Sequence, residues 1–222
     1  MRFKHVFSII GPVMVGPSSS HTAGAVRIGR VARQLLGRQP EEAEITLYGS
    51  FAETYSGHGT DLALVGGLLD FDADDERIPE AFAEAERLGL RFILKPGSAG
   101  TMPHPNFAKI TARAGGLEVS VQGASIGGGN IEIYSLNGFD TGCSGYYPTI
   151  AISHEDRVGV LASITGTVSR SGLNIGFMKL SRKERSGAAM TVVESDRRPD
   201  EELLEALRQL AHVEKVSVID VT

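Results

Sequence analysis

Two histidines stand out because each lies among small residues at the predicted start of a helix. The first is His21, in the segment Gly-Pro-Ser-Ser-Ser-His-Thr at residues 16–22. Four hydroxyl side chains surround it: Ser18, Ser19, Ser20 and Thr22. Free backbone N–H groups and the positive end of a helix dipole favour an anion at such a position, and histidine titrates near neutral pH. The segment therefore predicts an anion-binding site with a group that can move a proton, while an ordinary helix N-cap is the simpler alternative.

His58 repeats this arrangement in the segment Gly-His-Gly-Thr-Asp at residues 57–61. Glycines on both sides let the backbone approach a ligand closely, although a plain turn would use the same residues. A third histidine, His104, precedes Pro105 and Asn106 in a proline-flanked loop. The local sequence there predicts only turn chemistry.

The composition excludes several other kinds of chemistry. Cys143 is the only cysteine, and one thiol cannot form an internal disulfide, a cysteine-rich zinc site or an iron–sulfur cage. The 27 acidic residues outnumber the 22 basic ones, which gives a net charge of −5. This charge balance and the absence of Trp argue against nucleic-acid binding.

The sequence predicts no membrane segment. Its longest apolar run, residues 62–69, includes two glycines and is far shorter than the about 20 residues that a membrane span needs. The N-terminal residues Met-Arg-Phe-Lys-His lead into no secretory signal pattern. We therefore expect a cytoplasmic protein.

The elements that must position the histidines are helices separated by short strands. Serines predict a helix over 22–36 that stops at Gly37, and Thr60 or Asp61 would cap a second helix after Gly59. A third helix is predicted at 79–88. Strands are predicted at 45–48, around Phe92, around Val119 and at 131–133, the last after a turn formed by the glycines at 127–129. The pattern predicts a mixed α/β domain without fixing its topology.

The C-terminal part follows a more regular pattern. Strands are predicted at 149–153, 174–180, 188–193 and 213–221, with helices at 158–170 and 200–210, and Asp156 is expected to cap the first helix. The order βαββαβ is that of a ferredoxin-like unit. Residues 1–146 also hold 22 of the 27 glycines. The predicted fold class is therefore α+β, with a mixed α/β domain over 1–146 and a ferredoxin-like domain over 147–222.

The order of the motifs resembles that of one protein family. The segments 16–22 and 57–61, His-Pro-Asn at 104–106 and Ile-Gly-Gly-Gly at 126–129 are similar to a series in the beta chain of iron–sulfur-dependent, two-subunit L-serine dehydratases (L-serine ammonia-lyases). The resemblance covers essentially the whole chain. The C-terminal domain resembles an ACT domain, and the N-terminal domain also resembles the allosteric substrate-binding domain of some phosphoglycerate dehydrogenases.

The resemblance implies a subunit that acts with a partner. In this family the alpha chain carries a [4Fe–4S] cluster on cysteines, and the two chains remove water from L-serine to give an aminoacrylate, which hydrolyses to pyruvate and ammonia. The single cysteine agrees with a chain that holds no metal ligands itself. By motif position, His21 and His58 match histidines implicated in activity. His104 and Asn106 match a His-x-Asn pair linked to ligand binding, and Ser18, Ser19, Ser20 and Thr22 are the expected substrate-binding or anion-binding hydroxyls.

In the ACT part, His154, Asp156 and Asn174 match a serine-contacting loop of phosphoglycerate dehydrogenase. Asp156 stands where that enzyme has Asn, and a carboxylate repels the carboxylate of serine but attracts an ammonium group or a cation. Serine and a monovalent, potassium-type cation are both open as effectors. We expect Asn174 to open a strand beside the Asp156 loop, so that both face one pocket, which self-association of ACT units would complete.

Two other functions stay open on the sequence. An ACT unit attached to an anion-binding domain could be a freestanding amino-acid-binding regulatory protein without catalytic activity. A pyridoxal-phosphate dehydratase is the third alternative, but none of the six lysines lies in a recognisable cofactor context.

Overall fold

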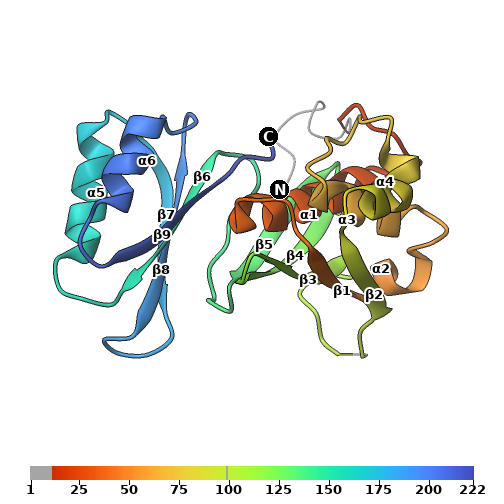
Figure 1. Ribbon diagram of the computed structural model, residues 1–222, viewed down its shortest axis with the longest axis horizontal. Helices are drawn as coiled ribbons and strands as arrows, with labels where there is room; N and C mark the ends of the chain where they lie inside the picture. Colours follow the sequence, from red (N-terminus) through yellow and green to blue (C-terminus); the bar gives the residue numbers. More distant parts are fainter. Residues whose placement is uncertain (1–11, 99) are drawn as a thin grey trace.

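The computed structural model describes residues 12–98 and 100–222. The chain forms two lobes that lie side by side, each built on its own sheet (Figure 1). Within these described ranges no helix is long and apolar enough to cross a membrane. The N-terminal residues that bear on the prediction of no secretory signal lie outside them.

The N-terminal lobe has a five-stranded sheet in the order β2-β1-β3-β4-β5. Only β1 and β2 pair in parallel, and the other neighbours are antiparallel. The strands are β1 (Glu42–Tyr48), β2 (Arg91–Pro96), β3 (Phe107–Ala114), β4 (Leu117–Gly127) and β5 (Asn130–Leu136). The helical elements are η2 (Ser19–Ala23), α1 (Gly24–Leu36), α2 (Ser50–Thr54), α3 (Thr60–Leu68), η3 (Ile78–Glu80) and α4 (Ala81–Arg87).

Helix α1 packs between the sheet and α3 (Figure 1). Two glycines allow the helices to approach closely, because a Cβ atom on Gly29 would lie 2.4 Å from the carbonyl oxygen of Leu64, and one on Gly67 would lie 2.1 Å from that of Val26. The apolar side of α1 is fully buried. This packing fixes the N-terminal end of α1, where His21 lies.

The predicted elements of this lobe are largely confirmed, with three differences. The helix expected from residue 22 begins earlier, as the π-helical turn η2, and becomes α-helical at Gly24. The short helix α2 and the strand β3 were not predicted. The turn expected at the glycines is present between β4 and β5.

The C-terminal lobe has the ferredoxin-like order βαββαβ, as predicted. Its sheet runs β7-β8-β6-β9 with antiparallel neighbours. Helices α5 and α6 lie on one face, and the other face points toward the N-terminal lobe (Figure 1). The elements are β6 (Thr149–Glu155), α5 (Val160–Arg170), β7 (Ile175–Arg182), β8 (Ala188–Ser195), α6 (Glu201–Arg208) and β9 (Val213–Ile219).

One prediction about this lobe is wrong, because Asp156 does not cap the first helix. The N-cap residue of α5 is Gly159, in the left-handed region with φ 91°, and no side chain caps the helix. The Asp156 carboxylate instead accepts hydrogen bonds from the backbone N–H of Ser186 and from Arg182, both at 3.1 Å. The residue therefore fastens the β7–β8 hairpin rather than the helix.

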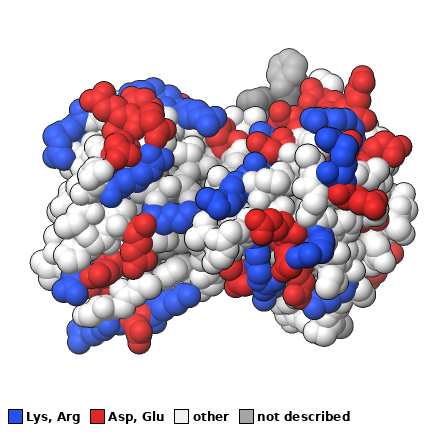
Figure 2. Space-filling model, viewed as in Figure 1, with Lys and Arg blue, Asp and Glu red and all other residues white. Residues whose placement is uncertain are grey.

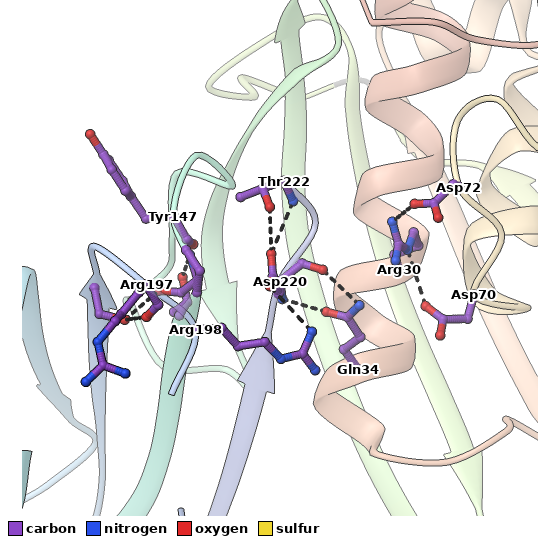
Figure 3. Close-up of polar contacts among 12 residues, drawn as sticks. Arg30, Gln34, Asp70, Asp72, Tyr147, Arg197, Arg198, Asp220 and Thr222 are labelled. Carbon is purple, nitrogen blue, oxygen red and sulfur yellow. Dashed lines mark hydrogen bonds and ion pairs between the residues drawn. The ribbon is translucent and has the colours of Figure 1, made fainter. Parts of the chain in front are cut away.

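The hydrophobic core of the N-terminal lobe extends onto one face of the C-terminal sheet, whose other face forms a separate cluster with α5 and α6. Ala151, Met190 and Val192 of the C-terminal sheet join the same apolar cluster as α1 and β5. Polar contacts reinforce the junction, since Gln34 on α1 exchanges two hydrogen bonds of 3.0 and 2.7 Å with the backbone of Asp220 (Figure 3). Figure 2 shows acidic and basic side chains intermixed over both lobes on the face in view, with no broad area of one sign.

Candidate functional site

His21 lies at the start of η2 with a hydroxyl group on each side of its ring. Nδ1 is 3.2 Å from the Ser20 hydroxyl and 3.4 Å from the Ser18 hydroxyl, whereas Nε2 is 3.2 Å from the Ser50 hydroxyl. Ser18 is also the N-cap residue, and its oxygen accepts a hydrogen bond from the backbone N–H of His21. Ser18 therefore acts as the helix N-cap and also contacts the His21 ring. Because a hydroxyl can donate or accept, either neutral tautomer of His21 is satisfied.

The structure brings His21 and His58 together. Their ring centroids are 5.1 Å apart, and the edge of Phe51 packs on His21 from another side, at 5.4 Å. His58 is exposed, whereas His21 is half-buried. Burial and the nearby His58 both lower the pKa of His21, so the ring is neutral and able to accept a proton at neutral pH.

Ser50 is a residue of this cluster that sequence reasoning missed. It is the first residue of α2 and follows Gly49, whose φ of 55° and ψ of −131° suit glycine alone. A Cβ atom on Gly49 would lie 2.5 Å from the carbonyl oxygen of Pro105. The loop that carries His104 and Asn106 therefore packs directly beside the residue that precedes Ser50.

The loop is held in turn to the end of β4. His104 Nδ1 accepts a hydrogen bond from the backbone N–H of Asn106 at 3.1 Å. The backbone N–H of Ser125 donates a hydrogen bond to the carbonyl of Asn106, and the side-chain amide of Asn106 donates one to the carbonyl of Ser125. Ser125 in turn contacts Gly24, the first residue of α1. Three segments that are distant in sequence thus meet at one end of the N-terminal sheet.

Not every predicted hydroxyl faces the histidines. Thr22 is buried, and its hydroxyl packs against Gly16 without a hydrogen-bond partner in the described residues. Ser19 takes part through its backbone, since its carbonyl accepts from the N–H of Gly24 and closes the π-helical turn. The hydroxyl groups that contact the His21 ring are those of Ser18, Ser20 and Ser50.

In the C-terminal lobe Asn174 lies apart from the other two predicted residues, His154 and Asp156. His154 is 3% exposed and holds the sheet together: its Nδ1 donates to the carbonyl of Glu155 at 2.8 Å, and its Nε2 accepts from the hydroxyl of Thr191 at 2.9 Å. Asn174 donates to Asp196 at 2.7 Å, at the opposite end of β7 from Arg182 and Asp156. The prediction that Asn174 lies beside the Asp156 loop is therefore wrong within one chain.

Cys143 does not fit a cluster ligand. It is 5% exposed, and burial together with the charge of Glu194 raises its pKa to about 12. The thiol is protonated at neutral pH, whereas metal ligation requires the thiolate. Over residues 12–98 and 100–222, no three His, Cys, Asp or Glu residues are grouped so that they could hold a metal ion.

Comparison with known proteins gives two family matches and several relatives. The family described as "Serine dehydratase beta chain" matches residues 5–88, and the ACT domain family matches residues 149–212. The "Probable L-serine dehydratase, beta chain" of Bacillus subtilis (strain 168) is 48% identical over 219 residues, which cover 99% of each chain. The "L-serine dehydratase, beta chain" of Peptoniphilus asaccharolyticus is 39% identical over 202 residues, 90% of this chain and 91% of that one. The "D-3-phosphoglycerate dehydrogenase" of Methanocaldococcus jannaschii is 25% identical over 206 residues, 88% of this chain and 37% of that one.

Proposed function

Because this chain belongs to the family of L-serine dehydratase beta chains, we propose that it converts L-serine to pyruvate and ammonia together with a separate alpha chain that carries a [4Fe–4S] cluster. The assignment of the cluster to the partner is supported by the cysteine count, since Cys143 is the single cysteine of the sequence, and its thiol is buried with a raised pKa. We also propose that the ACT domain makes the activity responsive to an effector.

The observation that carries the proposal is the pair of histidines within a ring of hydroxyl groups. His21 is neutral because burial and His58 lower its pKa, so it is suited to accept the α-proton of L-serine as a general base. The hydroxyls of Ser18 and Ser20, beside the N-terminal end of η2 and α1, are suited to hold the substrate carboxylate. Exposed His58 lies where a partner chain can approach.

His104 and Asn106 are proposed to bind ligand at the same end of the sheet. Their loop packs on Gly49, and Gly49 precedes the Ser50 hydroxyl that contacts His21. A ligand group bound by this loop would therefore lie on the same side of the lobe as the histidines.

The test is anaerobic co-purification with the alpha chain, followed by an assay of pyruvate formed from L-serine. We expect the isolated chain to be colourless and inactive and the complex to be brown and oxygen-sensitive. Stoichiometric iron and sulfide on the isolated chain would contradict the assignment of the cluster to the partner. If the chain binds amino acids but never forms an active complex, it is the freestanding regulatory protein instead.

Variants of the histidine cluster test the roles of its members. We expect His21→Ala and His58→Ala each to lower turnover of the complex by at least about 100-fold, the usual cost of losing a general acid or base. Ser50→Ala removes one hydrogen bond to the ring, and we expect about a 10-fold loss. His212→Ala, in the C-terminal lobe, is the matched control. If both histidine variants form complexes of normal size and iron content and show near-normal turnover, the two histidines have only a structural role.

The ACT domain is proposed to pair through β7, which is an edge strand with exposed Phe177 and Leu180. Antiparallel pairing of two β7 strands about a two-fold axis would place Asn174 of one copy at the end where Arg182 and Asp156 of the other copy lie. This pairing would complete a pocket for serine or for a monovalent cation from two chains, although each chain alone keeps these residues apart.

We expect Asp156→Ala and Asn174→Ala to alter the response of the complex to serine or potassium more than its maximal turnover. Asn137→Ala, in the other lobe, serves as the control. If both variants respond to serine and potassium as the unmodified protein does, the pocket is not used. Analytical ultracentrifugation gives the number of copies of each chain in the complex. A complex with a single copy of this chain would contradict the pairing.

A further inference from the structure

A cleft of about 570 Å³ lies between the two lobes, outside the histidine cluster. One wall is β5 with the end of β4, the second is formed by β7 and β8, and the floor is the segment 140–146 that connects the lobes. Its volume is in the range of small-molecule sites. The cleft is distinct from the loop of Asp156, which lies at the other end of the C-terminal sheet.

The walls of the cleft carry more negative than positive charge. Glu132, Asp140 and Glu194 line it, and Lys179 is the one basic residue among its lining side chains. Lys179 and Asp140 form a loose ion pair of 3.5 Å at the exposed rim. Glu132 and Glu194 form no ion pair among the described residues, and Glu132 accepts a hydrogen bond of 2.8 Å from the Tyr134 hydroxyl.

Glu194 is the more informative of the two because it is 6% exposed. One of its oxygens accepts a hydrogen bond of 2.5 Å from the backbone N–H of Ser144. That contact orients the carboxylate without neutralising it. A buried carboxylate is costly unless a positive charge accompanies it, so the cleft is complementary to a cation.

The arrangement of the acidic residues favours an organic cation over a metal ion. No three His, Cys, Asp or Glu residues of the described chain are grouped so that they could hold a metal ion. Between its polar groups the cleft also presents apolar surface, including the side chains of Phe177 and Tyr146, which are about half exposed. A ligand that matches both features has one positive group and an apolar remainder.

We propose that this cleft binds a small molecule that carries an ammonium group on an apolar body. The ammonium group lies beside Glu194 and Glu132, and the apolar part packs on Phe177, Tyr146 and Ile126. A carboxylate on the same molecule is accommodated at Lys179 but is not required. The site uses residues of both lobes, and it does not depend on the activity proposed for the histidine cluster.

Three matched probes test the chemistry on the full chain by isothermal titration calorimetry: isopentylamine, L-leucine and 4-methylpentanoate. The first lacks the carboxylate of L-leucine, and the last lacks its ammonium group. We expect the two amines to bind with dissociation constants below about 1 mM and the carboxylic acid to bind at least about 10-fold more weakly. Failure of isopentylamine to bind at up to about 10 mM, or equal binding of 4-methylpentanoate, would overturn the proposal.

Glu194→Gln tests the residue assignment, because glutamine keeps an oxygen for the Ser144 N–H and removes only the charge. We expect it to weaken isopentylamine binding by at least about 10-fold, whereas Glu118→Gln, an exposed residue at the start of β4 that does not line the cleft, leaves binding unchanged. Phe177→Ala is a second variant, and it should also weaken isopentylamine binding. Unchanged affinity in the folded Phe177→Ala chain together with unchanged affinity in Glu194→Gln would show that the cleft is not the site.

Discussion

At the scale of single residues, His21 is shaped by neighbours from three parts of the chain. Ser18 and Ser20 come from its own segment, Ser50 comes from α2, and His58 comes from the loop before α3. The serine hydroxyls satisfy the ring nitrogens, whereas burial of the ring and, after it, the nearby His58 disfavour protonation. A histidine surrounded by hydrogen-bonding groups therefore still has a lowered pKa.

The influence of His58 on His21 can be measured directly. Replacing His58 with alanine removes the second of the two causes that lower the pKa of His21, after burial, so we expect that pKa to rise toward its ordinary value. An NMR pH titration of the His21 ring protons measures this change, and His212→Ala should leave it unaltered.

The same shift has a consequence for stability. The folded chain binds the His21 proton less readily than the unfolded chain, so the free energy of unfolding should fall as the pH drops below about 6.5. This loss should be smaller in His58→Ala than in the unmodified protein. An unchanged His21 titration in His58→Ala would show that the two rings do not interact.

At the scale of elements, the junction of β1 and α2 depends on Gly49. A side chain there would meet both an unfavourable backbone conformation and the carbonyl of Pro105. We expect Gly49→Ala to lower the free energy of unfolding by about 1–3 kcal/mol and to move Ser50 away from His21. Urea unfolding measures the first effect.

Gly57→Ala is the matched control for this prediction. Its φ is not in the left-handed region, and the nearest atom to an added Cβ would be 3.7 Å away. We expect little loss of stability in that variant. Equal losses in the two variants would mean that the contact between Gly49 and Pro105 does not position α2.

Sequence patterns predicted the elements that carry strong local signals. The serines before α1 and the glycines before α3 marked helix starts that the structure confirms. Strand β3 was missed because three of its buried positions are alanines, which favour helices and contribute little hydrophobic contrast. Helix α2 has only five residues and depends on tertiary contacts.

The parts of the site that were missed depend on contacts between distant residues. Ser50 is 29 positions from His21, and no local pattern connects the two. The cap expected from Asp156 failed because Gly159 starts the helix and the Asp156 carboxylate has better partners in the β7–β8 hairpin. Side-chain pairing across a fold is decided by topology, which single-sequence patterns leave open.

At the scale of the whole molecule, the lobes are joined by a shared core and by the double hydrogen bond between Gln34 and Asp220 (Figure 3). We expect Gln34→Ala to lower the free energy of unfolding by about 1–2 kcal/mol, because two hydrogen bonds are lost at the junction. Gln209→Ala, which affects a contact within exposed α6, should cost much less.

Chemical unfolding followed by circular dichroism measures both variants. Because the core of the N-terminal lobe includes residues of the C-terminal sheet, the unmodified chain should unfold in one transition. Two separate transitions in the unmodified chain would contradict the picture of lobes that are stabilised together.

Helix α1 connects the two regions that this structure links to function. The turn η2, which leads directly into α1, carries His21, and at the other end of α1 the carbonyl of Leu35 accepts hydrogen bonds from Lys215 at 2.8 Å and Ser217 at 3.2 Å, both on β9 of the C-terminal sheet. Helix α1 is about 20 Å long, and its C-terminal end is held by the ACT domain. A tilt of the helix by about 3° about this end would move its N-terminal end, beside His21, by about 1 Å. A displacement of this size is enough to change a reaction rate by about 100-fold.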